Sequence, residues 1–472
     1  MTRLFPALLA SSLLLPFPTA AMAQAPAQPR PLTRWEQTAR DLLKELIEIN
    51  TTESAGSTLK AAEAMAARMK AAGFPDSDVV VVPQPPRKGN LVVRLRGKNR
   101  ALKPILLLSH IDVVEAKPED WTLPPFQFIE KDGTFFGRGV ADDKDDGAIH
   151  LTILLRMKAE GIVPDRDVVA ALTTDEEGGP ENGVAFLLAQ RPDLMRAEFA
   201  LNEGGSGTAR DGRKLSNDVQ ASEKRVANFR LEVTNEGGHS SVPIKDNAIT
   251  HLAEALAKLG AYDFPVRLNA VTTAYFTRSA DIVGGAMGAA MKAVVANPKD
   301  EAAVRTLSSD RRYNSQLRTT CVATMLDGGH ATNALPQRAR ATVNCRILPE
   351  ESTPDVQATL QRVIGDTAVK VTVLRAAEAS QPSPLAPGLI AQIERVTKEM
   401  WPGVVVIPTM STGATDGRLL RNAGVPVYGL AGQFYGNPNA HGMNERIPAQ
   451  AFYESLEFMT RMVRVLSRSG GI

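Results

Sequence analysis

Helical and strand-like patterns of apolar residues alternate along the first half of the chain. Apolar positions recur every three or four residues over 33–73, which predicts amphipathic helices there. Short apolar runs follow, each ending in polar residues: PILLLSHIDVVE, DVVAALTTDEEGG and AEFALNEGG. Helical patterns such as DGAIHLTILLRMKAEG lie between these runs. Strands that alternate with helices indicate an α/β fold with a mostly parallel sheet.

The pattern changes near residue 220 and returns near residue 384. RVANFRLEVTNEGGHSS alternates like a half-exposed strand, and AITHLAEALAKLG has a helical period. QLRTTCVATML and RARATVNCRIL resemble two strands that could pair antiparallel. We therefore predict a smaller α+β domain over residues 221–376. It would be inserted between two parts of the α/β domain, residues 24–220 and 377–472. Its internal segment 262–316 cannot be placed from sequence.

Residues 1–23 have the pattern of a secretory signal peptide. Arg3 gives a positive start, residues 4–18 are mostly apolar, and Ala21, Met22 and Ala23 fit a small-x-small cleavage site. The apolar stretch is interrupted by prolines and is short for a bilayer span. An uncleaved anchor is the alternative. We expect an exported protein, either periplasmic or secreted.

Length and charge narrow the class of protein further. A chain of 472 residues suggests two or three structural units. The 54 basic and 52 acidic residues leave a net charge of only +2. This balance gives no support to nucleic-acid binding or to an anionic membrane surface as the partner.

The two cysteines lie on the two candidate antiparallel strands. These residues, Cys321 and Cys345, could oxidise in an exported protein. Two separate buried thiols remain an equal alternative because spacing alone cannot establish a disulfide. Their number and spacing do not match a zinc finger.

Histidines and carboxylates follow the apolar runs of the α/β part. The three runs end in His110 and Asp112, in Glu176 and Glu177, and in Glu203. Ligands of open α/β sheets bind beyond the carboxyl ends of the strands. We therefore expect these side chains to meet at one site.

Two further segments add ligands of the same kind. GRGVADDKDD supplies Asp142, and the late NAHGMNE supplies His441. Nitrogen and oxygen ligands suit zinc, with manganese or cobalt as rivals. The set is too large for one tetrahedral zinc. Two metals about 3.5–4 Å apart that share one carboxylate would use it.

Short motifs along the chain resemble those of one enzyme family. In order they are SHIDVV, GRGVADDK, TTDEEGG, NEGG, GGHSS, NALP and AHGMNE. They resemble the di-zinc metallopeptidase family of glutamate carboxypeptidase, aminoacylase, carnosinase and succinyl-diaminopimelate desuccinylase, over about residues 35–465. The resemblance implies a catalytic α/β domain interrupted by a lid, or dimerisation, domain. It also allows a homodimer through the lid.

The resemblance assigns a metal-binding role to five residues. It implies that His110 and Glu203 bind one zinc ion. Glu177 and His441 would bind the other, and Asp142 would bridge the two.

Catalytic roles follow from the same resemblance. Asp112 would orient His110 and raise its basicity. Glu176 would be the general base that takes a proton from the attacking water and passes it to the leaving nitrogen. His239 matches a family histidine that reaches from the lid to the developing oxyanion. In dimeric members it comes from the neighbouring subunit.

Three more residues match substrate-binding positions or lie near them. Asn333 and Arg346 match lid residues that grip the substrate, and Arg346 would hold its carboxylate through a planar fork. Arg418 is a further candidate for substrate contact. Two departures from the family pattern, the extra acids in DDKDDG and the Asn344 that replaces an acid, affect no predicted metal ligand.

The expected activity is metal-dependent hydrolysis of an amide bond next to a free carboxylate. The substrate would be a small molecule, and we favour a short peptide cleaved by a carboxypeptidase or dipeptidase. An N-acyl-amino-acid amidohydrolase is the main alternative. An inactive binding relative would be expected to lack a ligand or the base, yet all of these residues are present.

Overall fold

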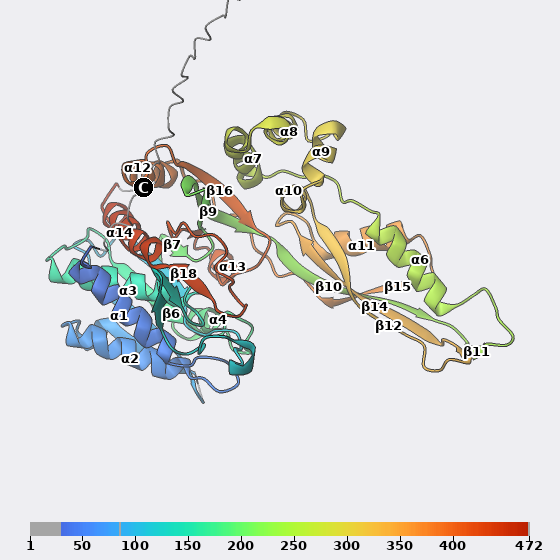
Figure 1. The fold of residues 1–472 in the computed structure, drawn as a ribbon, viewed down its shortest axis with the longest axis horizontal. Coiled ribbons are helices and arrows are strands. Elements are labelled where there is room, and N and C mark those ends of the chain that lie inside the picture. The colour runs from blue at the N-terminus through green and yellow to red at the C-terminus, as the bar shows by residue number, and fades with distance from the viewer. Residues whose placement is uncertain (1–29, 85, 471–472) are drawn as a thin grey trace, which may run out of the picture.

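A computed structural model describes residues 30–84 and 86–470 of the chain. An α/β domain holds both ends of this range, and an elongated second body, the lid, extends away from it (Figure 1). The predicted signal peptide lies outside the described residues. Within them, no helix combines the length and apolarity needed to cross a membrane.

A nine-stranded sheet forms the centre of the α/β domain. Its strand order is β1-β2-β6-β3-β7-β17-β9-β16, with β8 paired to β9. The neighbours β6, β3, β7 and β17 run parallel. The strands are β1 (Val79–Gln84), β2 (Lys88–Leu95), β3 (Ile105–His110), β6 (Val168–Thr173), β7 (Phe199–Asn202), β8 (Gly207–Arg210), β9 (Arg213–Glu223), β16 (Val405–Ser411) and β17 (Val427–Gly429). The predicted α/β fold with a mostly parallel central sheet is confirmed.

Helices cover both faces of this sheet. Strand β3 sends Ile105 and Leu107 into one core, and Leu106 and Leu108 into another. Burial on both faces explains why the strands appear in the sequence as continuous apolar runs. One face carries α1 (Arg34–Glu48), α2 (Thr58–Ala71), α3 (Lys144–Ala159), α12 (Pro387–Met400) and α14 (Ala449–Leu466). The other carries α4 (Gly183–Gln190), α5 (Pro192–Met195) and α13 (Gly417–Asn422).

Small elements complete the α/β domain. A three-stranded sheet has the order β18-β5-β4. These strands are β18 (Arg446–Pro448), β5 (Thr134–Phe136) and β4 (Ile129–Lys131), and the short helices are η1 (Asp76–Asp78) and η2 (Pro118–Asp120).

The lid is built on an antiparallel sheet of order β12-β14-β10-β15. Helices α6 (Ala248–Gly260) and α11 (Thr353–Ile364) pack on it and enclose a separate core. The strands are β10 (Arg225–Thr234), β12 (Thr320–Gly328), β14 (Arg338–Ile347) and β15 (Lys370–Arg375), and β11 (Gly238–His239) pairs with β13 (Ala334–Leu335). Cys321 on β12 lies opposite Cys345 on β14, and the two form a disulfide. This settles the alternative that the sequence left open.

The segment that the sequence could not place forms four helices. They are α7 (Ala270–Val283), α8 (Gly285–Ala296), α9 (Glu301–Ser308) and α10 (Arg311–Leu317), and they share a core of their own. Helix α7 packs against β16 at the edge of the large sheet. There Arg278 Nη1 donates to the backbone oxygen of Val406 at 2.8 Å. The segment thus covers an edge strand that would otherwise offer unpaired backbone groups.

Candidate active site

Two histidines meet on one carboxylate beyond the ends of the parallel strands. His110 Nε2 lies 3.0 Å from Asp142 Oδ1. His441 Nε2 lies 3.1 Å from the other oxygen, Asp142 Oδ2. Glu177 also approaches His441, with a carboxylate oxygen 3.0 Å from Nε2. Asp142 therefore lies between two imidazoles, as a bridging ligand would.

Glu203 and Glu176 also lie close to His110. Possible ligand atoms of His110, Glu176 and Glu203 all lie within 4.8 Å of one another, and the same holds for His110, Asp142 and Glu177. Glu203 directly follows β7, and His110 ends β3. The structure thus brings together every residue that the sequence assigned to metal binding, together with the predicted base.

Asp112 links the histidine strand to the acidic loop. Its carboxylate accepts hydrogen bonds from the backbone N–H groups of Glu176 at 3.2 Å and Glu177 at 3.0 Å. Its backbone oxygen lies 3.1 Å from His110 Nδ1, and its carboxylate lies 3.6 Å from the same nitrogen. Asp112 therefore positions the acidic loop as well as the imidazole.

The acidic loop is held in an uncommon backbone conformation. Asp175 has a positive φ of 61°, which non-glycine residues seldom adopt. Its side chain is 4% exposed and forms an ion pair with Lys88. Asp175 is thus a structural residue that turns the chain so that Glu176 and Glu177 face the site.

The buried carboxylates of the cluster would be stabilised in their charged form by a nearby positive charge. Burial raises the pKa of Glu203 well above its ordinary value; neighbouring carboxylates add to the effect and His110 opposes it. Burial likewise raises the pKa of Glu176 to about 8. Within residues 30–84 and 86–470, no lysine or arginine forms an ion pair with Glu176, Glu177, Glu203 or Asp142. Divalent cations would supply the missing charge, so this donor set fits metals.

The two histidines of the cluster have raised pKa values, because carboxylates surround them. Hydrogen bonds to Asp142 and Glu177 raise the pKa of His441 to about 10. Burial lowers the pKa of His110, but hydrogen bonds to Asp112 and Asp142 outweigh it and raise the pKa well above 6.5. Imidazole binds a metal in its neutral form. A bound cation would therefore take the place of a proton on each ring.

One buried carboxylate near the site was missed at the sequence level. Asp416 is 2% exposed, and its Oδ1 accepts from Asn182 Nδ2 at 2.5 Å. Asn182 also donates to the backbone oxygen of Asp175 at 3.1 Å. Asp416 thus holds the acidic loop through Asn182, in addition to the direct hydrogen bonds of Asp112. Asp416 lies two residues before Arg418, in the sequence GATDGR, but it does not follow an apolar run as the other acids of the site do.

The two candidate arginines lie where the lid meets the α/β domain. Arg346 is on β14, and its Nη1 donates to the backbone oxygen of Thr412 at 3.3 Å. Arg418 begins α13 next to Gly417, and its Nε donates to Glu378 at 2.9 Å. The guanidinium of Arg418 already has a carboxylate partner within the chain, whereas the contact of Arg346 is a single backbone oxygen.

His239 and Asn333 lie together, but far from the metal ligands. His239 is on β11, and the backbone oxygen of Asn333 accepts from Ser240 N–H at 3.0 Å. Both side chains are exposed. Figure 1 shows β11 at the free end of the lid, opposite the end that joins the α/β domain. Within this single chain, the two residues are not brought to the metal cluster.

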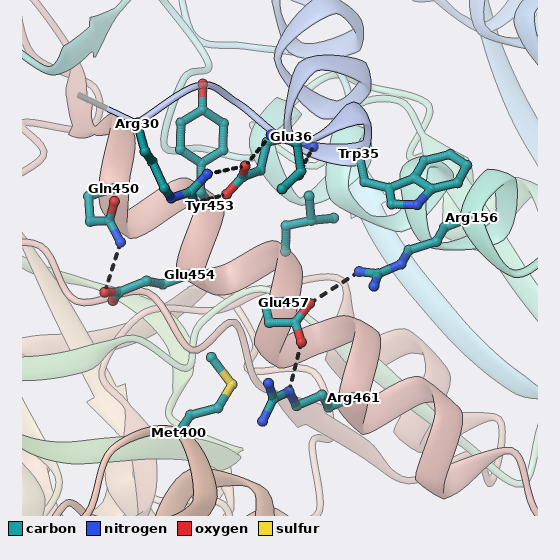
Figure 2. Close-up of a pocket in the computed structure, with 12 residues that line it drawn as sticks. Arg30, Trp35, Glu36, Arg156, Met400, Gln450, Tyr453, Glu454, Glu457 and Arg461 are labelled. Carbon is teal, nitrogen blue, oxygen red and sulfur yellow. Dashed lines mark hydrogen bonds and ion pairs between the residues drawn. The ribbon is translucent and has the colours of Figure 1, made fainter. Parts of the chain in front are cut away.

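Two cavities differ in their relation to the metal cluster. One of about 270 Å³ adjoins the metal cluster and is lined by Glu177 and Asp112. Another of about 430 Å³ lies between α1, α12 and α14 (Figure 2). Its charged side chains are already paired, as in Arg30 with Glu36 and Arg156 with Glu457. It contains none of the predicted site residues.

Comparisons with known proteins agree with this geometry. Residues 106–465 match the model of the peptidase family M20/M25/M40. The chain is 29% identical over 387 residues to the human N-fatty-acyl-amino acid synthase/hydrolase PM20D1, covering 78% of this chain and 75% of that protein. It is 29% identical over 395 residues to "Probable carboxypeptidase S-like 2" of Dictyostelium discoideum, covering 79% and 74%.

The fold also matches solved structures. An M20 family metallo-carboxypeptidase from Sulfolobus solfataricus superposes with a TM-score of 0.68 at 16% identity, covering 91% of this chain and 99% of that one. Human carnosine dipeptidase 1 superposes with a TM-score of 0.60 at 14% identity, covering 92% and 97%. With the family model and the clustered ligands, these matches establish that the chain belongs to peptidase family M20/M25/M40 and is a metal-dependent hydrolase of amide bonds.

Proposed function

We propose that this protein is a two-zinc exopeptidase that cleaves the amide bond next to the free carboxylate of a short peptide. The observation that carries the proposal is the shared carboxylate of Asp142, whose two oxygens face His110 and His441. Glu203 would complete the ligands on the His110 side, and Glu177 those on the His441 side. Cobalt and manganese accept the same nitrogen and oxygen donors.

The metal pair, when bound, polarises the scissile carbonyl and lowers the pKa of the attacking water towards ~7. The protein's own part is proton transfer and orientation. Of the group His110, Glu176 and Glu203, Glu176 is the acid that the family pattern leaves free to act as the base. It takes the proton of the attacking water and delivers it to the leaving nitrogen. Asp112 fixes Glu176 through its backbone N–H.

Arg346 would select substrates that carry a free carboxylate. It lies on the lid strand β14 at the end that faces the α/β domain, where it contacts Thr412. A guanidinium can hold a carboxylate with two parallel hydrogen bonds. Asn333 lies beside His239 at the lid tip, so it would help to grip the substrate at the centre that His239 reaches. The ion pair with Glu378 makes Arg418 a weaker candidate than Arg346.

We propose that His239 reaches a catalytic centre from a second copy of the chain, in a homodimer formed through the lid. Strand β12 is at the edge of the lid sheet and exposes apolar side chains. Val322 is 61% exposed, Met325 68% and Leu326 71%. An exposed apolar edge strand favours pairing with another strand. In that arrangement His239 would donate to the developing oxyanion.

The second candidate substrate class is N-acyl amino acids. The human relative is named as an N-fatty-acyl-amino acid synthase/hydrolase, and such compounds carry the same free carboxylate. The cavity beside Glu177 favours peptides, because Glu115 also lines it and forms no ion pair with a lysine or arginine among the described residues. Acidic walls suit a protonated amine better than a fatty-acyl chain. We also propose export of the protein, supported by the signal-like residues 1–23.

A matched substrate panel tests this proposal. The chain from Gln24, loaded with zinc, is assayed for amine release from dipeptides and N-acyl amino acids, each with its carboxyl group free or amidated. We expect release from free-carboxyl dipeptides and loss of activity with a chelator. Release mainly from N-acyl amino acids would select the alternative. Equal cleavage of free and amidated substrates would contradict the role of Arg346.

A further inference from the structure

A buried ion pair joins the two chain segments that carry Asp142 and His441. Arg138 Nη1 lies 2.7 Å from Glu445 Oε2, and the two side chains are 2% and 0% exposed. Arg138 comes four residues before Asp142, and Glu445 four residues after His441. Neither partner is a predicted metal ligand. Arg138 lies in the motif GRGVADDK, which supplies Asp142, and Glu445 lies in AHGMNE, which supplies His441.

Each partner of the pair also holds the backbone of the other partner's segment. The Glu445 carboxylate accepts from the N–H groups of Gly139 at 3.0 Å and Ala141 at 2.9 Å. Arg138 Nη2 donates to the backbone oxygen of Gly442 at 3.0 Å. Ala141 directly precedes Asp142, and Gly442 directly follows His441. The contacts therefore end one residue away from each metal ligand.

The surrounding structure leaves this pair little freedom. Strands β5 and β18 pair beside it, so the two segments enter the site in fixed register. The Arg138 guanidinium lies over the Trp121 ring, 5.0 Å from its centroid. His441 itself has a positive φ of 62°. Such a backbone conformation persists only when its surroundings hold it in place.

We propose that Arg138 and Glu445 are positioning residues that set the spacing between Asp142 and His441. They thereby determine how tightly the ion on the His441 side is held. Burying two charges costs free energy of desolvation that their attraction offsets only in part, so stability alone is a weak reason for the pair. The inference rests on the proposed two-metal function.

Glu445→Gln tests the proposal in the full mature chain. The variant keeps the size of the side chain but removes its charge and two of its acceptor lone pairs. Zinc is titrated against a competing chromophoric chelator, and bound zinc is counted by mass spectrometry. Loss of a group that orients a ligand typically weakens metal affinity 10- to 100-fold. We expect that loss for the ion on the His441 side and a smaller loss for the other ion, because Asp142 is shared by both.

Asp167→Asn is the matched control. It breaks another partly buried ion pair, Arg94 with Asp167 at 2.9 Å, which lies at the opposite ends of the strands. We expect it to lower the thermal midpoint without changing the affinity for either ion. A purely structural role for Glu445 would make the two variants behave alike.

The double variant Arg138→Met/Glu445→Gln covers the case in which the single variant does not fold. It removes both charges, so that no unpaired charge stays buried. Its fold is checked by circular dichroism with chelator present. Unchanged affinity for both ions in either folded variant would overturn the inference. A wild-type protein that binds fewer than two ions would overturn the proposed two-metal function as well, so the two failures are distinguishable.

Discussion

The catalytic centre and the lid tip both contain residues of the family pattern, but only those of the centre are brought together within one chain. The centre collects His110, Glu177 and Glu203 from the ends of three adjacent strands. The tip presents His239 on a short two-stranded sheet of β11 and β13, where it is exposed and remote from the metal ligands (Figure 1). Parallel topology assembles the first set within one chain. The second set has no such scaffold, and it must be carried to a centre by lid motion or by a second copy.

The largest expected effect comes from the centre. Glu176→Gln removes the group that moves the proton, which typically contributes 10²- to 10⁴-fold to the rate. We expect kcat to fall by that factor while two metal ions stay bound, because Glu176 is not needed as a ligand. Steady-state kinetics and metal analysis on the same sample check this. Wild-type turnover in the variant would exclude Glu176 as the base.

The next effect comes from the tip. His239→Ala removes one oxyanion donor, and such a loss costs about 10²- to 10³-fold in kcat. The metal content should not change, since His239 does not contact the metal ligands in the chain.

Mixing two inactive variants separates the two routes by which His239 could reach a centre. Random exchange of Glu176→Gln and His239→Ala subunits gives mixed dimers with one centre whose base and partner histidine are both intact. About a quarter of wild-type activity should then return if the histidine acts across a two-fold dimer. No recovery, with dimers present by light scattering, would favour closure of the lid within one chain.

Arg346 lies between these two regions, and its removal should have an intermediate effect. A hydrogen bond to a charged group contributes about 1.5–3 kcal/mol, or roughly 10- to 150-fold in binding. We expect Arg346→Ala to raise KM by that factor for free-carboxyl substrates and to leave amidated substrates unaffected. Arg418→Ala is the control, because Arg418 already pairs with Glu378. An equal loss in both variants would argue against a specific carboxylate clamp.

The same contrast shows what the sequence could predict. The positions of His110, Glu177 and Glu203 followed from apolar runs that stop at acids and histidines. Asp142 and His441 lie in other segments, and the ligand roles came from the family resemblance.

The contacts of Glu445 and Asp416 could not be predicted, because they join segments far apart in sequence. Glu445 accepts from the backbone N–H of Ala141, and Asp416 accepts from the side chain of Asn182. The extra acids of DDKDDG point inward, where Asp145 accepts from Gln433 at 2.7 Å. Burial, which sequence alone does not report, decides whether such a departure affects the substrate.

The smallest expected effect is the change of folding stability with pH, which has opposite signs for a histidine of the α/β domain and a histidine of the lid. His150 on α3 is 1% exposed, and burial lowers its pKa from 6.5 to about 3. The unfolded chain therefore binds the extra proton first, and His150 costs stability as pH falls from about 6.5 towards 3. The slope cannot exceed about 1.4 kcal/mol per pH unit.

His251 on the lid helix α6 has the opposite sign. A hydrogen bond to Asp366 raises its pKa above 6.5. Its contribution is complete below pH 6.5 and is lost as pH rises through the folded-state pKa. Thermal midpoints of His150→Leu and His251→Leu, each compared with wild type from pH 5 to 8, separate the two. The gain in stability from His150→Leu should grow on acidification, because leucine takes up no proton when the chain unfolds. The loss from His251→Leu should shrink as pH rises. Parallel curves would mean that neither histidine titrates differently in the folded and unfolded chain.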